Sequence, residues 1–352
     1  MRIGIPRELK PLEGRVGMTP AACAGLVREG HQVFIETGAG RLSGYDDAQY
    51  REVGVEIVPD HEAAFKAAEM VVKVKEPIAE DLKYLRKDHL LFCYLHLAAE
   101  PALTKALQAI GLTAIAFETV EVNGGLPLLA PMSDIAGRLS VQVATHLLHQ
   151  PQGGKGILLG GIPAAKRGKV VIIGAGVAGF NAAVVAAGMG AEVTVFDINR
   201  DRLVAARALG NNVTGLYPHP SDIADAVHQA DILIGAVLIA GEKAPKLVTE
   251  DMVRSMEKGS VVVDIAIDQG GCIATAKPTT YADPTYVWEG IVHFTVTHMP
   301  GAVPRTASQA LSAAIAPYAS RLAAGGWEDF APLQGGINVQ GGKVVHPALL
   351  KD

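Results

Sequence analysis

Short apolar runs recur along the first 130 residues, and stretches with helical periodicity separate them. The runs are continuous rather than alternating, which is typical of strands in a parallel sheet covered on both faces. After the first run, Thr19 and Pro20 supply an N-cap and a first-turn proline, so we expect a helix over about 20–29 that ends at Gly30. The runs that predict strands are RIGIP, QVFIE, VEIV, MVVKV, LLFCYL and TAIAF.

A second series of runs follows a long helical stretch from Ser133 to about Gln150. Within that stretch, apolar residues stand four positions apart on one face, which indicates a helix that connects two units. The second series predicts six strands, the number in a complete dinucleotide-binding sheet. A helix over about 306–323 and a short tail end the chain. The six runs are KVVIIG, AEVTVFD, NVTGLY, ADILIGAV, SVVVDIAID and IVHFTVTHMP.

The two series predict two domains, and 352 residues is the length of about two domains. We expect 1–130 and 300–352 to form one discontinuous substrate and catalytic domain, because the last segment is too short for a domain of its own. Residues 131–299 would form the dinucleotide-binding domain. The predicted fold class is α/β, with two Rossmann-like, doubly wound parallel-sheet domains and the active-site cleft between them.

Composition argues against several classes of function. With 31 basic and 36 acidic residues, the net charge is −5, so the chain lacks the basic footprint that nucleic-acid binding needs. Its three cysteines, Cys23, Cys93 and Cys272, lie far apart and form no C-x-x-C. We therefore expect no disulfide framework and no metal site, and a reducing cytoplasm is the natural compartment. The first residues also lack the apolar core of a secretory signal.

One segment has the length and composition of a membrane span. Residues 170–191 contain a single polar side chain, Asn181, and are long enough to cross a bilayer. However, the segment is rich in glycine and alanine, and it breaks at a G-x-G turn after four residues that favour strands. It also leads directly into another strand-like run. We expect a strand, a turn and a helix here, and no membrane partner.

A glycine-rich turn follows the strand KVVII and begins the helix VAGFNAAVVAAG. In a dinucleotide-binding loop of this spacing, Gly174 permits the tight turn, Gly176 admits the pyrophosphate and Gly179 lets helix and strand pack closely. Asp197 ends the next strand, 18 residues after Gly179, where a carboxylate accepts the ribose hydroxyls. The alternative is a packing turn with a helix-capping aspartate. We interpret the loop as a dinucleotide site.

Four polar side chains indicate the chemistry outside that loop. His96 lies in the apolar run LLFCYLHLAA, and Lys75 lies with Lys73 on one face of a strand near the C-terminal edge of the sheet. Arg15 occupies a glycine-flanked loop after the first strand, and Asp268 follows the run VVVDIAI. Open α/β sheets bind ligands at such strand ends. A cation pair would hold a carboxylate, the histidine would move a proton, and the acid would orient water or ammonium.

Each of these residues also has a purely structural interpretation. His96 would be a satisfied core histidine, Lys75 would extend its amine to solvent at a strand end, and Asp268 would cap a turn. Arg15 would be a solvated loop residue. Sequence alone leaves these alternatives open.

The chain resembles the alanine dehydrogenases, within the alanine dehydrogenase and nicotinamide-nucleotide transhydrogenase family. The resemblance extends from residue 1 to beyond 300, so it is far more specific than the glycine loop. The segments that carry it are GIPRELKPLEGRVGMTP, MVVKVKEP, YLHLAAEPALT, LPLLAPMSDIAGRLS, GILLGGIP, LIGAVLIAGEKAPKLV, VVVDIAIDQGGC, PTTYADPTYV and MPGAVPRTAS.

The resemblance implies a role for each candidate. Arg15 and Lys75 would bind the carboxylate of pyruvate or alanine, and His96 would be the general acid/base. Asp268 would be the second active-site acid. Members of the family are typically cytoplasmic homohexamers specific for NAD. The implied cofactor contacts are Ser133, Gly174, Gly176, Val177, Ala178, Gly179, Asp197, Arg202, Val237, Leu238, Ile265, Ala266, Ile267, Asp268, His298 and Met299.

The chain departs from the family pattern at three places. His298 stands where asparagine is usual, which affects an implied cofactor contact. Asp134 adds a charge beside Ser133, where an uncharged residue or a longer acid is usual. The C-terminus after GKVVHPALLKD is also shorter than is typical, which would affect the packing of the last helices but not the cleft.

The leading hypothesis is reversible oxidative deamination of L-alanine to pyruvate and ammonia with NAD. The first alternative is the soluble nucleotide-binding part of a proton-translocating transhydrogenase, which would not need the full set of Arg15, Lys75, His96 and Asp268. The second alternative is a dinucleotide-binding redox sensor without turnover, which only His298 favours. The breadth of small oxo acids accepted, glyoxylate among them, stays open.

Overall fold

The structure, a computed structural model, describes residues 1–237 and 244–350, and it divides into two compact units. Unit 1 consists of Met1–Met132 and Gly301–Asp352, and unit 2 of Ser133–Pro300. The C-terminal segment therefore belongs to the same unit as the N-terminal one, and each unit contains one sheet.

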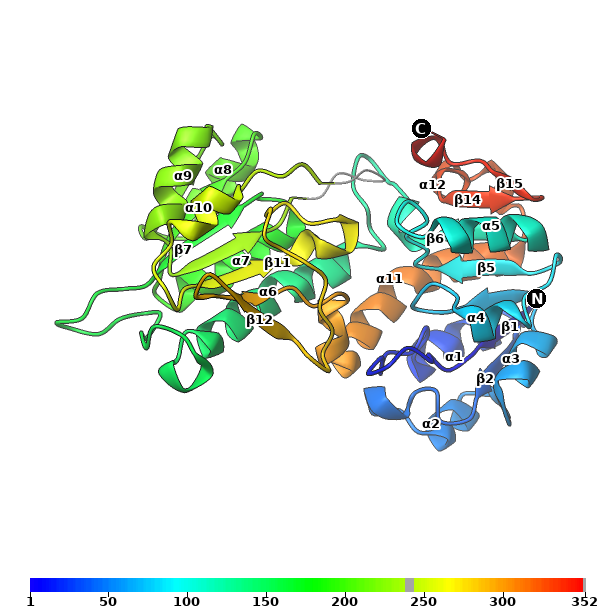
Figure 1. Cartoon of the computed structure of the whole chain (residues 1–352). Helices are drawn as coiled ribbons and strands as arrows, with labels where there is room; N and C mark the ends of the chain where they lie inside the picture. The colour runs from blue at the N-terminus through cyan, green and yellow to red at the C-terminus, as the bar shows by residue number, and fades with distance from the viewer. Residues whose placement is uncertain (238–243, 351–352) are drawn as a thin grey trace. The chain divides into compact units, whose positions relative to one another are not determined.

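The sheet of unit 1 has eight strands in the order β3-β2-β1-β4-β5-β6-β14-β15. β1 to β6 are parallel, whereas β14 is antiparallel to β6 and β15 is antiparallel to β14. Figure 1 shows β14 and β15, in red, beside β6. The strands are β1 (Arg2–Ile5), β2 (Gln32–Glu36), β3 (Glu56–Val58), β4 (Met70–Val72), β5 (Leu90–Cys93), β6 (Thr113–Ala116), β14 (Ile337–Gln340) and β15 (Lys343–Val344).

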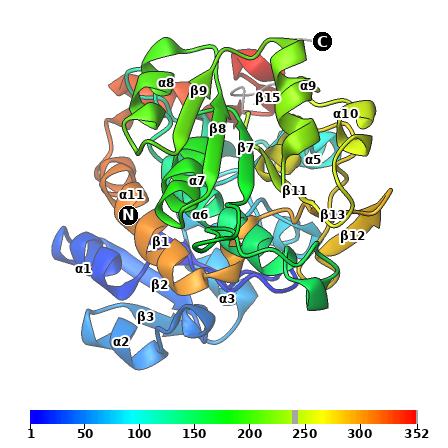
Figure 2. The same cartoon turned by 90° about the vertical axis from the view of Figure 1, so that its left-hand side faces the viewer.

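The sheet of unit 2 has seven strands in the order β9-β8-β7-β10-β11-β13-β12, and only β12 is antiparallel. Figure 2 shows β7, β8 and β9 side by side. The strands are β7 (Lys169–Ile173), β8 (Glu192–Phe196), β9 (Val213–Leu216), β10 (Ile232–Gly235), β11 (Val261–Asp264), β12 (Thr285–Trp288) and β13 (Ile291–Phe294).

Both sheets have the strand order of a doubly wound dinucleotide-binding fold, with β1 beside β4 and β7 beside β10 where the order reverses. Every residue of the inner strands β4, β5, β10 and β11 is buried, because helices cover both faces. This burial explains why their sequences read as continuous apolar runs. The predicted α/β class with two Rossmann-like parallel sheets is confirmed.

The strands β12, β14 and β15, which pair antiparallel, were not predicted from the sequence. β12 lies at an edge and has no fully buried residue, although its short run TYVW consists of residues that favour strands. The hairpin of β14 and β15 did have a signal, because Gly341 and Gly342 separate two short runs and both adopt positive φ. Such a glycine pair is a typical two-residue hairpin turn. The segment therefore adds an edge to the sheet of unit 1 and is more than a tail.

The helices agree with the expected βα alternation. The segment 170–191 forms β7 and α7, and no helix among residues 1–237 and 244–350 is long and apolar enough to span a bilayer. The α-helices of the described residues are α1 (Pro20–Arg28), α2 (Asp47–Glu52), α3 (His61–Ala67), α4 (Ala79–Leu82), α5 (Pro101–Ile110), α6 (Ala130–Leu147), α7 (Val177–Gly188), α8 (Arg200–Arg207), α9 (Pro220–Gln229), α10 (Glu250–Arg254), α11 (Pro304–Ala324) and α12 (Ala331–Gly335).

α11 holds the loop that follows β1. Two serines one turn apart on α11, Ser308 and Ser312, accept hydrogen bonds from the backbone N–H groups of Val16 and Thr19, at 3.0 and 2.9 Å. Both serines are buried, so without these bonds the loop would leave buried donors unsatisfied. The C-terminal segment thus fixes the backbone on either side of residues 17–18.

Candidate functional site

Three neighbouring strands of unit 1 end beside one another, and each is followed by one of the predicted site residues. Arg15 follows β1, Lys75 follows β4 and His96 follows β5. β4 pairs with both β1 and β5, so these three loops share the C-terminal edge of the sheet. The order of the strands reverses between β1 and β4, which is where doubly wound sheets bind ligands.

Arg15 is buried and is paired with Glu13. Its Nε donates to Oε1 of Glu13 at 2.7 Å and its Nη2 donates to Oε2, while Nη1 lies 3.3 Å from the sulfur of Met132. Burial favours loss of charge, but the two hydrogen bonds to Glu13 outweigh it, so the pKa of Arg15 is raised and that of Glu13 is lowered. The guanidinium is 3% exposed, so the solvated-loop alternative is wrong.

Lys75 is held by Glu76. Its Nζ lies 3.0 Å from Oε2 of Glu76, and Lys10 pairs with the other oxygen of the same carboxylate. Burial raises the pKa of Glu76, but Lys75, His96 and Lys10 together lower it to about 2. Lys75 is only 2% exposed, so it does not extend to solvent as the alternative interpretation required.

Lys73 has a different environment from Lys75. The predicted strand ends earlier than expected, because β4 stops at Val72 and both lysines follow it. The Nζ of Lys73 lies 3.3 Å from carboxylate oxygens of both Glu8 and Asp81, and all three groups are buried. Glu8 also accepts the backbone N–H of Val74 at 2.6 Å. Lys73 is therefore a structural counter-charge that holds the start of the Lys75 loop.

His61 extends this buried network. Its Nδ1 lies 2.8 Å from Oε2 of Glu36, and its Nε2 lies 2.8 Å from Oδ1 of Asp81. Burial lowers the pKa of His61, but the hydrogen bonds to Asp81 and Glu36 outweigh this and raise the pKa to about 9. A protonated His61 therefore bridges the two carboxylates at neutral pH.

His96 lies in a turn after β5 and not inside an apolar strand, so that part of the sequence interpretation is wrong. Its φ is +49°, in the left-handed region that non-glycine residues rarely adopt. Glu118 holds this turn, because it accepts the backbone N–H of His96 at 2.6 Å and that of Leu95 at 3.1 Å. The same Oε1 lies 3.9 Å from Nδ1 of His96. A strained backbone maintained by a second residue is typical of functional sites.

Tyr94 connects His96 with Arg15. Its ring stacks on the imidazole of His96, with centroids 5.8 Å apart and planes inclined by 7°, and its hydroxyl donates to the carbonyl of Leu128 at 2.6 Å. The charge of Arg15 acts to lower the pKa of Tyr94, and the charge of His96 acts to lower the pKa of Glu76. The structure thus brings Arg15, Lys75 and His96 together at one edge of unit 1.

The glycine loop of unit 2 joins β7 to α7, as predicted. Gly174 has φ +99° and its Cβ would lie 2.8 Å from the carbonyl oxygen of Ala236, so no other residue fits this turn. A Cβ on Gly179 would lie 1.8 Å from the carbonyl of Gly174, so helix and strand pack without space for a side chain. A Cβ on Gly176, in contrast, would meet nothing within 4 Å. The space beside the N-terminus of α7 is therefore open.

Asp197 lies at the C-terminal end of β8, beside that loop. Its Oδ2 accepts the N–H of Ala175 at 2.7 Å and its Oδ1 accepts the N–H of Asn199 at 2.7 Å. Each oxygen keeps a second lone pair for a further donor. Nη1 of Arg202 lies 3.7 Å from Oδ2, but the side chain of Arg202 is 55% exposed, so this contact is weak.

Asp268 lies in a single 3-10 helix, Ile265–Gln269, that directly follows β11. Asp264 holds this segment, since its two oxygens accept the N–H of Ala266 at the start of the 3-10 helix and the N–H of Ile273 beyond its end, each at 3.0 Å. Burial raises the pKa of Asp264 to about 6. Asp264, and not Asp268, is therefore the residue that caps the turn. The carboxylate of Asp268 pairs with His298, whose Nδ1 lies 3.1 Å from Oδ1.

The remaining cofactor residues inferred from resemblance differ in their burial, among those that the structure describes. Ser133 is half-buried in the first turn of α6, and Val177 is exposed at the start of α7. Ala266, Ile267 and Met299 are buried, so their side chains face the core. Ala178, Val237 and Ile265 are half-buried, and Leu238 lies outside the described residues.

Asp134, one of the departures from the family pattern, contacts the glycine-loop helix. Its Oδ1 accepts a hydrogen bond from Nδ2 of Asn181 at 2.7 Å, and Asn181 also donates to the carbonyl of Val177. Gly137, one turn further along α6, packs so closely that a Cβ there would lie 2.1 Å from the carbonyl of Ala178. The charge of Asp134 is thus used to join α6 to α7.

Models of two protein families match almost the entire chain: the N-terminal domain of alanine dehydrogenase/PNT at residues 4–136 and its C-terminal domain at 140–347. An alanine dehydrogenase of Bacillus subtilis is 50% identical over 358 residues, covering 100% of this chain and 94% of its own. One from Methanococcus maripaludis is 47% identical, covering 100% and 96%.

The chain belongs to the alanine dehydrogenase/PNT family. A solved L-alanine dehydrogenase is 51% identical and superposes with a TM-score of 0.93 over 99% of this chain and 98% of that one. A transhydrogenase structure from Sinorhizobium meliloti is 26% identical, with a TM-score of 0.84 over 99% of this chain and 100% of that one. The relatives of about 50% identity are alanine dehydrogenases, which are oxidoreductases, and the resemblance seen in the sequence is confirmed.

Within this member of the family, the sequence analysis missed the carboxylates that hold the candidate residues. Glu13 and Glu76 lie one or two positions from the cations that they pair with, and this short spacing was a signal. Glu118 had no local signal, because it contacts the turn of His96 from the 3-10 helix Phe117–Thr119 after β6. Asp264 could have been recognised as a helix N-cap.

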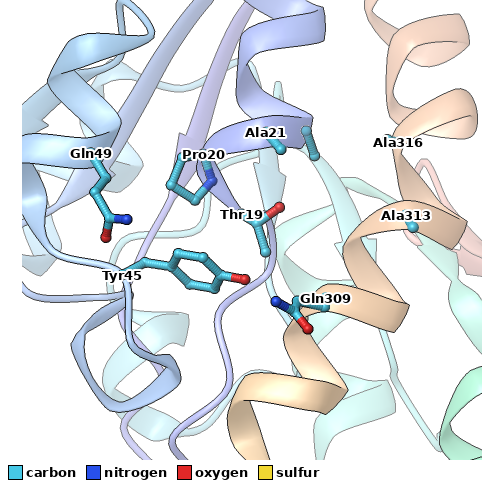
Figure 3. A pocket seen from close by; sticks show the side chains of 9 residues that line it. Thr19, Pro20, Ala21, Tyr45, Gln49, Gln309, Ala313 and Ala316 are labelled. Atoms are coloured by element: carbon cyan, nitrogen blue, oxygen red, sulfur yellow. The ribbon is translucent and has the colours of Figure 1, made fainter.

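A cavity of about 510 Å³ lies elsewhere in unit 1, and none of the predicted site residues lines it. Figure 3 shows Thr19, Tyr45 and Gln309 around it, with Ala313 and Ala316 on α11. No group of three or more histidine, cysteine or acidic side chains that could hold a metal occurs in the described part of the chain.

The His61 bridge predicts a pH-dependent contribution to stability. Because the folded pKa is raised from 6.5 to about 9, this contribution is complete below about pH 6.5 and is lost as the pH rises through about 9. We expect urea unfolding to show that the free energy of unfolding falls between pH 6 and pH 10 by about 2–3 kcal/mol more in the unmodified protein than in His61→Gln. His149→Gln, at an exposed histidine of unit 2, is the control and should follow the unmodified protein. Parallel curves for all three proteins would contradict the bridge.

Proposed function

We propose that this chain catalyses the reversible NAD-dependent oxidative deamination of L-alanine to pyruvate, ammonia and NADH. One observation carries the proposal: in a member of this family, two buried cations, Arg15 and Lys75, lie with His96 at one sheet edge. Relatives of about 50% identity over their full length are named alanine dehydrogenases, which supports this choice within the family.

Arg15 and Lys75 would bind the substrate carboxylate. Each cation is already oriented by a carboxylate, Glu13 or Glu76, so little side-chain entropy is lost when the substrate binds. Because these pairs keep the cations desolvated, a charge-assisted bond to the substrate is stronger than it would be in water. A carboxylate fixed in this way orients the α-carbon of the substrate.

His96 would carry protons during turnover. Its Nδ1 lies 3.9 Å from Oε1 of Glu118, and we assign proton exchange with the substrate to Nε2, on the opposite side of the ring. The base accepts a proton from the water that adds to the imine carbon. It then gives this proton to the nitrogen and takes up the hydroxyl proton as the C=O bond forms, the C–N bond breaks and ammonia leaves. Asp268 would orient that water or the departing ammonium.

The glycine loop and Asp197 fit NAD. The open space beside Gly176 is where a pyrophosphate would approach the N-terminus of α7, and Asp197 has lone pairs for the ribose hydroxyls. When bound, NAD supplies the acceptor for the hydride that leaves the α-carbon. We extend the proposal to the other cofactor contacts inferred from resemblance: Ser133, Val177, Ala178, Arg202, Val237, Leu238, Ile265, Ala266, Ile267, Asp268, His298 and Met299.

We also propose, from the resemblance, that the protein is a cytoplasmic homohexamer. Cys23, Cys93 and Cys272 are buried and unbonded, which suits a reducing compartment. The transhydrogenase and sensor alternatives gain no specific support, since the complete set of Arg15, Lys75, His96 and Asp268 is what substrate turnover needs.

Absorbance of NADH in the presence of L-alanine and NAD tests the proposed function directly. We expect L-alanine-dependent NADH formation, and we expect His96→Ala to lower turnover by about 10²–10⁴ while NADH affinity changes little, because a positioned acid/base is worth that much. No activity in the unmodified protein would refute the function. A variant that unfolds without a specific catalytic defect would instead make His96 a structural residue.

Removing the charge of Lys75 should weaken pyruvate binding. In Lys75→Met, which keeps most of the side-chain volume, the KM for pyruvate should rise about 10–100-fold, because a charge-assisted hydrogen bond contributes roughly 1.5–3 kcal/mol. Lys66→Met, at an exposed lysine on α3, is the control and should leave KM unchanged. An unaltered KM in Lys75→Met would refute the carboxylate clamp.

Cofactor preference follows from Asp197. Its two oxygens are each held by a backbone N–H, so the carboxylate cannot turn away from a 2′-phosphate, and Arg202 is too exposed to compensate. We expect NAD to be preferred over NADP by at least about a hundredfold in kcat/KM. Asp197→Ser should relax the preference by freeing Arg202. Comparable efficiencies with both cofactors in the unmodified enzyme would show that Arg202 governs the site.

A further inference from the structure

His298 and Asp268 form a two-point contact in unit 2. The imidazole Nδ1 of His298 lies 3.1 Å from Oδ1 of Asp268, and the backbone N–H of His298 donates to Oδ2 at 3.4 Å. Asp268 lies after β11 and His298 lies after β13, and these two strands are adjacent and parallel. One residue therefore contacts both oxygens of a carboxylate that belongs to the neighbouring loop.

We propose that His298 is a positioning residue that orients the carboxylate of Asp268 by donating to both of its oxygens. The proposal rests on the proposed function, in which Asp268 is the second active-site acid. The two side chains are 26% and 29% exposed, so water competes for the carboxylate. Two donors on His298 restrict the rotation of the Asp268 carboxylate about its Cβ–Cγ bond. Hydrogen bonds to a charged acceptor are stronger than those between neutral groups.

The backbone at residue 298 restricts which residues can perform this role. φ is +62°, in the left-handed region where asparagine, aspartate and histidine are the favoured non-glycine residues. The donor, Nδ1, is bonded directly to Cγ. Asparagine places its Nδ2 at the corresponding position, so it can donate in the same direction. Aspartate has the same shape and the same backbone tolerance, but it places an acceptor there.

The contact also changes the view of the cofactor site. The Nδ1 edge of the His298 ring is directed to Asp268, so this edge orients the carboxylate and does not contact the cofactor. Met299, the next residue, uses its carbonyl to accept the hydroxyl of Tyr281 at 2.6 Å, which holds the same loop from its other side. Substitution of the His298 side chain should therefore affect turnover more than NADH binding.

A series at residue 298 tests the proposal with L-alanine and NAD. His298→Asn keeps the donor and should lower kcat less than His298→Ala does. His298→Ala removes the side-chain donor and should lower kcat about tenfold, while His298→Asp adds a like charge and should lower it about a hundredfold. KM for L-alanine should change little in all three, and NADH affinity, measured by fluorescence, should agree within about threefold between His298→Asn and His298→Ala, because the role assigned to the donor is in turnover.

A second measurement separates positioning from general damage and needs no activity. In the protein without cofactor, His298→Asp should lower the urea midpoint relative to His298→Asn, because two carboxylates then face each other. Adding Asp268→Asn to His298→Asp should restore the midpoint, since an amide at 268 can donate to the new carboxylate. The double variant His298→Ala with Asp268→Asn should have the same kcat as the single variant Asp268→Asn, because His298 acts only through Asp268.

Three outcomes would overturn the proposal. Equal kcat and equal midpoints for His298→Asn and His298→Asp would show that the contact is inconsequential. A defect in His298→Asn as large as that in His298→Ala would assign the role to the ring itself. Additive losses with Asp268→Asn would show that His298 acts independently. If the unmodified protein does not oxidise L-alanine, the proposed function fails, and the midpoint series still decides whether the pair exists.

Discussion

A cation removed from water costs several kcal/mol unless a carboxylate accompanies it, and unit 1 buries three cations at the ends of two adjacent strands. Arg15, Lys73 and Lys75 are each within contact of at least one buried carboxylate. The loops after β1 and β4 depend on these pairs for their conformation. The same pairs keep Arg15 and Lys75 charged and fixed in direction, which is the condition for binding a small anion strongly.

The carboxylate partners also give two similar lysines different roles. Lys73 and Lys75 lie two positions apart, yet Lys73 is enclosed by Glu8 and Asp81, whereas Lys75 shares Glu76 with Lys10. The first pairing is a structural network that extends through His61. The second lies at the sheet edge beside His96, whose charge acts on Glu76. The two lysines therefore differ in role because their carboxylate partners lie in different places, although the side chains are the same.

Unit 2 uses the same strand order for a different task. Its glycine loop leaves space at a helix N-terminus, and Asp197 stands beside it with both oxygens already tied to the backbone. Asp264 fixes the loop of Asp268 from within, and His298 contacts that loop from the next strand. The asparagine usual in the family would place a donor at the same point, so the departure at His298 is consistent with a retained role.

The sequence by itself determined the class of fold, because that depends on apolar periodicity. It also determined the glycine loop with Asp197, through short spacings, and the family, through sequence motifs. It also identified Arg15, Lys75, His96 and Asp268 as candidates. Only the tertiary structure decided that Arg15 and Lys75 are buried and not solvated, that His96 lies in a turn held by Glu118, and that Asp264 is the turn cap. The physical reason is that burial and hydrogen-bond partners are set by residues distant in sequence: Glu118 lies 22 positions from His96, and α11 lies nearly 300 positions from the Arg15 loop that it holds. The local sequence pattern does not indicate contacts between residues so far apart in the chain.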